Sequence, residues 1–133
     1  MQKLFTGLVS ALLLSAPTIA QAETLMVDYF SLLGPADAYN SRGQPLNDLC
    51  TIVQQDRANW HKFRNREELD RGDFFFDSVY KRAMIAGKCE YDRSYYANSG
   101  ARIRNGTRSF YVYVRVYGSN GQVSRVLIAE GAG

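Results

Sequence analysis

Residues 108–117, RSFYVYVRVY, decide the fold because polar and apolar side chains alternate from Ser109 to Tyr117. A period of two is the pattern of a half-buried β-strand. One face of the predicted strand carries Phe110, Val112, Val114 and Val116, and the other carries Tyr111, Tyr113, Arg115 and Tyr117. The pair Asn120-Gly121 follows, and this pair favours a two-residue hairpin turn. A return strand is therefore predicted near residues 123–129.

Further strands are predicted on the amino-terminal side of this hairpin. Residues 101–104 precede a second Asn-Gly pair at 105–106, and residues 89–96 precede both. Strands joined by tight turns pair antiparallel, so the region after Gly87 is expected to form an antiparallel meander of three or four strands. Near the start of the chain, residues 25–30 also have the composition of a short strand.

Two helices are predicted between these strands. Residues 48–64 place their apolar side chains at helical spacing, and Asn47 or Asp48 can cap the first turn. Residues 73–86 begin at a possible cap, Asp73, and end before Gly87, which suits the left-handed position after a helix. The apolar stripe expected on this second helix consists of Phe76, Val79, Tyr80 and Ala83. A short connection should make the two helices an antiparallel hairpin.

The two cysteines, Cys50 and Cys89, fit this helical hairpin. Cys50 lies one turn into the first predicted helix, and Cys89 lies just after the second, so an antiparallel pair brings them together. We therefore expect a disulfide rather than two free thiols. The predicted fold class is α+β, a disulfide-linked helical hairpin followed by a three- to four-stranded antiparallel β-meander. The cysteines do not form a C-x-x-C pair and there is one histidine, so neither a metal site nor a cofactor is expected.

The first 22 residues have the pattern of a secretory signal peptide. Lys3 precedes an apolar run, Pro17 interrupts it, and Ala20-Gln21-Ala22 offers small residues to a signal peptidase. The expected organisation is a signal peptide over 1–22 and one small α+β domain over 23–133, in a secreted or periplasmic protein that is not transmembrane. Removal of Lys3 leaves 15 Lys and Arg against 13 Asp and Glu, a net charge of +2. This charge is too small for general capture of nucleic acid, which is not an expected partner.

A candidate binding surface lies on the polar face of the strand at 108–117. If Asn105-Gly106 closes a hairpin, that face gathers the cations and tyrosines Arg102, Arg104, Tyr111, Tyr113, Arg115 and Tyr117. Tyr and Arg are enriched where proteins bind one another. One alternative is that residues 23–40 cover this face. In addition, a plain two-residue register at Asn120-Gly121 places Val126 and Ile128 on the tyrosine side and Arg125 opposite Val116, which would bury part of it.

Asp56 and Arg57 interrupt the apolar side of the first predicted helix. Asp56 lies between Val53 and Trp60 on that side, and Arg57 lies at its edge. A buried carboxylate requires a partner, so both residues are expected to be structural and to form an ion pair or hydrogen bonds. A general acid or base is the alternative. His61, one turn after Arg57, is expected to be a partly exposed residue without a catalytic role.

No nucleophile elbow, phosphate-binding loop, zinc-protease motif or dinucleotide fingerprint occurs in the sequence. The favoured function is therefore a non-catalytic binding protein, an inhibitor or immunity-type partner of another protein, acting through the Arg/Tyr face. One alternative is a small secreted hydrolase such as a ribonuclease, by analogy of fold alone. Another is an envelope protein that binds anionic glycan or lipid through its arginines, in which case binding should depend strongly on salt.

Overall fold

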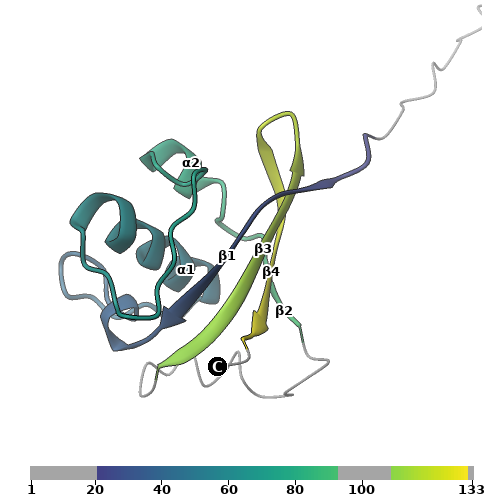
Figure 1. Ribbon diagram of the computed structural model, residues 1–133. Coiled ribbons are helices and arrows are strands. Elements are labelled where there is room, and N and C mark those ends of the chain that lie inside the picture. Colours follow the sequence, from purple (N-terminus) through teal and green to yellow (C-terminus); the bar gives the residue numbers. More distant parts are fainter. Residues whose placement is uncertain (1–20, 93–108, 132–133) are drawn as a thin grey trace, which may run out of the picture.

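The computed structural model describes residues 21–92 and 109–131, and it has the expected α+β class (Figure 1). A mixed four-stranded sheet in the order β1-β3-β4-β2 carries the helical region on one face. The elements in chain order are β1 (Thr24–Leu33), a 3-10 turn (Pro35–Asp37), α1 (Leu49–Ala58), a π-helical turn (Asn59–Phe63), α2 (Val79–Ala83), β2 (Cys89–Tyr91), β3 (Phe110–Ser119) and β4 (Gln122–Glu130).

The centre of the sheet is the hairpin that the alternating sequence predicts. In β3, Val112, Val114 and Val116 are fully buried against the helical layer, and Val126 and Ile128 of β4 are buried beside them. β1 is longer than the predicted strand at 25–30 and pairs antiparallel with β3 from Thr24↔Gly118 to Leu33↔Phe110. Its alternate residues Val27, Tyr29, Ser31 and Leu33 face the same core.

A β-bulge next to the hairpin turn corrects the register expected from the sequence. Asn120 and Gly121 both have positive φ, 51° and 71°, as a type I′ turn requires. However, the pairing shifts between Tyr117 and Gly118, so that Tyr117 faces Arg125. The expectation that Val126 and Ile128 join the tyrosine side is therefore wrong. A Cβ atom at Gly118 would lie 1.9 Å from the Gln122 carbonyl oxygen, which explains the glycine at this bulge.

β2 departs from the predicted antiparallel meander. It spans only Cys89–Tyr91 and pairs parallel with β4, from Cys89↔Val126 to Tyr91↔Ile128. Because β1 occupies the free edge of β3, the remaining edge for β2 is that of β4. Parallel strands cannot be joined by a tight turn, and residues 92–121, which include β3, lie between β2 and its parallel partner β4. The predicted strand at 101–104 and the turn at 105–106 lie outside the described residues.

The first predicted helix is confirmed as α1 followed by the π-helical turn. Asp48 caps it by accepting a hydrogen bond from the Cys50 N–H at 2.7 Å. Four apolar residues of α1 are buried on the sheet: Leu49, Cys50, Ile52 and Val53. The π-helical turn ends at Arg64, which has a left-handed φ of 56°.

The second predicted helix, 73–86, is wrong over most of its length, because only the short α2 is helical. Asp73 does not cap a helix. Its Oδ1 accepts the Phe75 and Phe76 N–H groups in a local turn, while its Oδ2 bonds elsewhere in the core. Ser78 caps α2 instead. Of the predicted stripe, Phe76 is buried, but Val79 and Tyr80 are 76% and 66% exposed, so the expected helical hairpin is reduced to one helix and a single turn.

The predicted disulfide between Cys50 and Cys89 is present, with a Cα–Cα distance of 5.4 Å. It ties the first turn of α1 to the start of β2, and so joins the helical layer to the sheet edge. Over residues 21–92 and 109–131, no helix is long and apolar enough to cross a membrane.

We expect removal of the disulfide to lower the free energy of unfolding by about 3–4 kcal/mol, because the bond closes a loop of 39 residues in the unfolded chain. The double variant Cys50→Ala/Cys89→Ala avoids leaving a free thiol. Chemical denaturation of the oxidised protein, the reduced protein and this variant measures the loss. Equal stability of all three would contradict the structural role of the bond.

Candidate functional site

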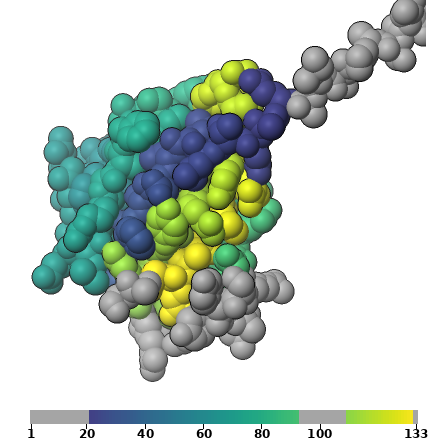
Figure 2. Space-filling model, turned by 45° about the vertical axis from the view of Figure 1, so that its right-hand side comes forward, coloured from purple at the N-terminus to yellow at the C-terminus, as the bar shows by residue number. Residues whose placement is uncertain are grey.

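The outer face of the sheet carries the predicted tyrosines and arginine. Tyr111, Tyr113, Arg115 and Tyr117 alternate with the buried valines of β3 and are partly exposed. Figure 2 shows β1, β3 and β4 side by side on the surface, with the helical region to one side. Arg102 and Arg104, the other predicted binding residues, lie outside the described residues.

The amino-terminal segment does not cover this face. β1 lies in the plane of the sheet beside β3, so residues 24–33 extend the face rather than bury it. Asp28, Phe30 and Leu32 point to the same side as the tyrosines, because Val27, Tyr29, Ser31 and Leu33 occupy the core side. The alternative that residues 23–40 bury the tyrosines is thus wrong for β1.

Three aromatic rings form a stack across β1 and β3. The Phe30 ring lies 4.7 Å from the Tyr113 ring and 5.4 Å from the Tyr111 ring, with interplanar angles of 28° and 10°. Phe30 remains 37% exposed. The Tyr113 hydroxyl donates to the Asp28 carboxylate, and this hydrogen bond raises the pKa of Tyr113. The stack is therefore a rigid aromatic surface with a fixed polar edge.

The two arginines of the outer face have nearby acidic groups. Arg125 lies over the Tyr117 ring at 4.3 Å and binds Glu23 through Nη2 at 2.7 Å. Hydrogen bonds from Ser124 and Arg125 lower the pKa of Glu23. Arg115 Nη2 lies 3.7 Å from the Asp92 carboxylate. Its Nε is shielded from solvent and has no hydrogen-bond partner among the described residues. Consequently the aromatic stack is flanked by nearly balanced charge.

The predicted structural pair, Asp56 and Arg57, forms the centre of a buried polar cluster on the other side of the sheet. Arg57 is fully buried, and its Nε donates to Asp56 at 2.8 Å. Its Nη1 donates to Asp73 and to the Arg71 carbonyl, both at 3.0 Å, and its Nη2 donates to Ser31 at 3.0 Å. The guanidinium carbon lies 3.9 Å from the centre of the Tyr29 ring. Each nitrogen of the guanidinium, and four of its five N–H groups, is thus paired with a core partner.

Ser31 links two carboxyl groups within this cluster. Its Oγ lies 2.6 Å from Asp56 Oδ1 and 3.0 Å from Asp70 Oδ1, and it also accepts from Arg57. A hydroxyl has one hydrogen, so it satisfies only one of the two carboxyl oxygens. Burial raises the pKa of Asp56, although Arg57 opposes the shift.

Asp73 is the second anchor of Arg57. Its Oδ2 accepts from Arg57 and lies 2.9 Å from His61 Nε2. Burial opposes ionisation, yet hydrogen bonds from the Phe76 N–H, His61 and Arg57 hold the pKa of Asp73 below its ordinary value. His61 therefore attaches the π-helical turn to the cluster, and its side chain is partly exposed, as expected.

The cluster lacks the arrangement of a hydrolase site. Ser31 is fully buried, so a substrate would not reach its hydroxyl. Arg57 lies between the Ser31–Asp56 contact and the His61–Asp73 contact, so the histidine does not activate the serine. Within the part of the chain that the structure describes, no group of three or more His, Cys, Asp or Glu side chains is arranged to hold a metal ion.

Sequence reasoning missed several members of both sites. On the outer face it missed Phe30 and Asp28. The alternation of side chains along β1 places both residues on this face once the strand is extended to Leu33. In the cluster it missed Ser31, Asp70 and Asp73. The sequence carries no comparable signal for these three, since they come from a strand and an irregular loop that meet only in the folded chain.

Comparison of the chain with protein-family models, with curated proteins and with solved structures found no match. The function of the protein must therefore be inferred from its own geometry.

We expect Arg57→Met to destabilise the protein by about 3–5 kcal/mol, because it leaves Asp56, Asp73 and Ser31 buried without their cationic partner. Thermal or chemical denaturation gives the value. Arg42→Met in an exposed loop is the matched control and should change the free energy of unfolding very little. A similar, small effect of both substitutions would contradict the central role of Arg57.

We expect the stability of the protein to fall as the pH rises from about 5 to 8. Burial, together with the nearby Asp56 charge, raises the pKa of Asp37 to about 7. The folded protein therefore binds more protons than the unfolded chain between about pH 4 and pH 7, and loses about 2–3 kcal/mol between pH 5 and 8 from this group. Denaturation at a series of pH values measures the slope. In Asp37→Asn the slope should be shallower, and an unchanged slope would contradict the assignment.

Proposed function

We propose that the protein is a non-catalytic binding protein that engages another protein through the outer face of its sheet. The observation that carries the proposal is the exposed stack of Phe30, Tyr111 and Tyr113, next to Arg115. Aromatic residues and arginine supply most of the energy at protein interfaces, because they combine a large contact area with polar ends. Rings already stacked in the free protein lose little conformational freedom on binding.

The charges on this face favour a protein partner over a polyanion. Arg125 is paired with Glu23, and Arg115 lies near Asp92, so the described face presents little excess positive charge. Anionic glycan or lipid would require unpaired cations and would bind with strong salt dependence.

The proposed place of action is outside the cytoplasm, in a secreted or periplasmic setting. The Cys50–Cys89 disulfide supports this setting, since disulfides persist in oxidising compartments. The leader pattern over residues 1–22 supports it independently.

A photo-reactive amino acid at position 111 tests the proposal by cross-linking proteins of the exported fraction. We expect a discrete cross-linked partner from position 111 and none from the same amino acid at position 42, which lies in an exposed loop. Tyr113→Ala and Arg115→Ala should each weaken binding of that partner by about 1–2 kcal/mol, the range of central interface residues, with little change in melting temperature.

Two controls separate this function from its alternatives. Arg42→Ala alters an exposed loop residue that is not part of the sheet and should leave partner affinity nearly unchanged. Binding should also persist when salt is raised from low to physiological concentration, whereas an anionic glycan or lipid ligand would be lost. If Tyr113→Ala and Arg115→Ala strongly lower the melting temperature while the folded variants bind the partner with unchanged affinity, the interaction surface lies elsewhere.

A further inference from the structure

The most exposed apolar side chains of the described residues lie in one stretch of the chain, residues 63–80. Phe74 is 78% exposed, and Val79 and Tyr80 at the start of α2 are nearly as exposed. Phe63, the last residue of the π-helical turn, is exposed as well. Large apolar side chains gathered at this exposure are unusual on a free protein, and such patches mark surfaces that meet a protein or a membrane.

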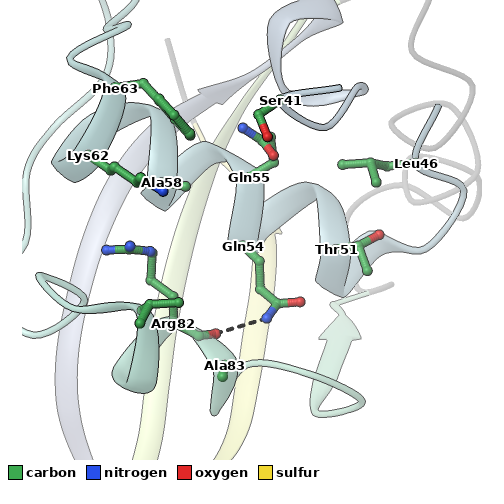
Figure 3. A pocket seen from close by; sticks show the side chains of 11 residues that line it. Ser41, Leu46, Thr51, Gln54, Gln55, Ala58, Lys62, Phe63, Arg82 and Ala83 are labelled. Carbon is green, nitrogen blue, oxygen red and sulfur yellow. Dashed lines mark hydrogen bonds between the residues drawn. The ribbon is translucent and has the colours of Figure 1, made fainter. Parts of the chain in front are cut away.

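These side chains also lie close together in space. Phe63 and Val79 line the same cavity between the π-helical turn and α2, and Figure 3 shows the Phe63 ring beside it. His61 of the same turn places its Nε2 atom 2.9 Å from Asp73 Oδ2, and Phe74 directly follows Asp73 in the chain. The exposed apolar residues are therefore grouped around one end of the helical layer.

The backbone holds Phe74 outside the core. Asp73 Oδ1 accepts the Phe76 N–H at 2.6 Å, and Asp73 Oδ2 accepts from the buried Arg57 at 3.0 Å. This turn directs Phe76 into the core, where it is fully buried, and leaves Phe74 on the surface. Arg82 of α2 then donates to the Phe76 carbonyl at 3.0 Å, which fixes α2 to the same turn. The exposed side chains thus stand on a rigid support and cannot retreat into the core.

The structure leaves this surface with an excess of positive charge. Residues 60–82 contain six Lys and Arg and five Asp and Glu, so the sequence alone is nearly balanced. However, the Asp70 and Asp73 side chains are turned into the core, and Asp77 is paired with Lys81 at 3.0 Å. Two glutamates are left. The cations that are exposed and have no ion-pair partner among the described residues are Lys62, Arg64, Arg66 and Arg71.

Cations and aromatic rings are interleaved in this region. Lys62 Nζ lies 5.0 Å from the centre of the Phe63 ring, and the Arg66 guanidinium carbon lies 4.1 Å from the centre of the Trp60 ring. The centre of a protein–protein interface is depleted of charge. At a membrane surface, by contrast, aromatic rings lie at the level of the headgroups while Lys and Arg meet anionic lipid. The combination of exposed apolar side chains and unpaired cations therefore favours a lipid surface.

We propose that this surface docks on a membrane that contains anionic phospholipid. Phe74, Val79 and Tyr80 enter the headgroup region, and the four exposed cations bind lipid phosphates. The surface belongs to the helical layer and is separate from the outer face of the sheet (Figure 1). The proposal does not depend on the protein partner proposed above, and the two are tested separately.

Co-sedimentation of the purified exported protein with lipid vesicles tests the proposal. Vesicles of phosphatidylcholine mixed with phosphatidylglycerol should sediment the protein at low salt, and vesicles of phosphatidylcholine alone should sediment far less of it. Raising the salt to physiological concentration should weaken the binding, because the cations are exposed and their attraction to lipid is screened.

Two variants with matched controls test the two halves of the surface. Val79→Ser should weaken binding to the anionic vesicles about five- to tenfold, because an apolar side chain no longer enters the headgroup region. Leu25→Ser removes an exposed aliphatic side chain from β1 and should have little effect. Arg64→Gln should weaken binding about fivefold, whereas Arg42→Gln in an exposed loop should not. All four positions are exposed, so the melting temperature should change little.

Several results would overturn the proposal. These are equal sedimentation with neutral and anionic vesicles, no sedimentation with either, and unchanged binding in Val79→Ser or in Arg64→Gln. An equal loss in Leu25→Ser would also overturn it, because binding would then not be specific to this surface. A photo-reactive amino acid at position 74 covers the remaining case. If it cross-links a protein while the vesicles fail to sediment the chain, the surface binds a protein and not lipid.

Discussion

The buried guanidinium of Arg57 connects three parts of the structure that are otherwise linked mainly by chain and packing. It joins α1 to β1 through Ser31, and to the loop before α2 through Asp73 and the Arg71 carbonyl. A buried cation is tolerated only when all its donors are paired, so each of these segments must be in place for the core to close. This requirement also explains why Asp73, although well placed to begin a helix, bonds to the core instead.

The sheet and the helical layer leave side chains exposed for different reasons. The sheet directs the small β-branched residues of β3 toward the helices and leaves the large tyrosines on the outside. The helical layer is incomplete, because α2 is a single turn, and its shortness leaves Val79 and Phe63 unburied beside Lys62 and Arg82. The aromatic stack is therefore a product of strand alternation, whereas the exposure of Val79 and Phe63 is a product of a helix that stops early.

Local patterns in the sequence were enough to predict the hairpin of β3 and β4, the helix α1 and the pairing of Cys50 with Cys89. For the hairpin and for α1 the signal lies within a few residues or in a spacing along one helix, whereas the disulfide follows from the presence of two cysteines in the sequence. The parallel pairing of β2 and the loss of helix over 73–78 depended on distant partners, namely β1 on the edge of β3 and Arg57 beside Asp73. The sequence predicted that Tyr111, Tyr113 and Tyr117 share one face of a strand. Their neighbours Phe30 and Asp28 could be assigned to that face only once β1 was known to pair with β3.

The pairing of β1 with β3 sets the order in which the chain can fold. Leu33 and Phe110 are the partners that lie nearest in sequence, so β1 has no place in the sheet until the chain beyond residue 110 has been synthesised. Bringing β1 and β3 together costs conformational entropy of the intervening chain before stabilising contacts form. Folding rates fall as contacts become less local. The hairpin of β3 and β4 closes within a few residues and is the natural nucleus. β1 is the first strand to be synthesised but is then among the last to join the sheet. Folding is therefore delayed until synthesis of the chain is nearly complete.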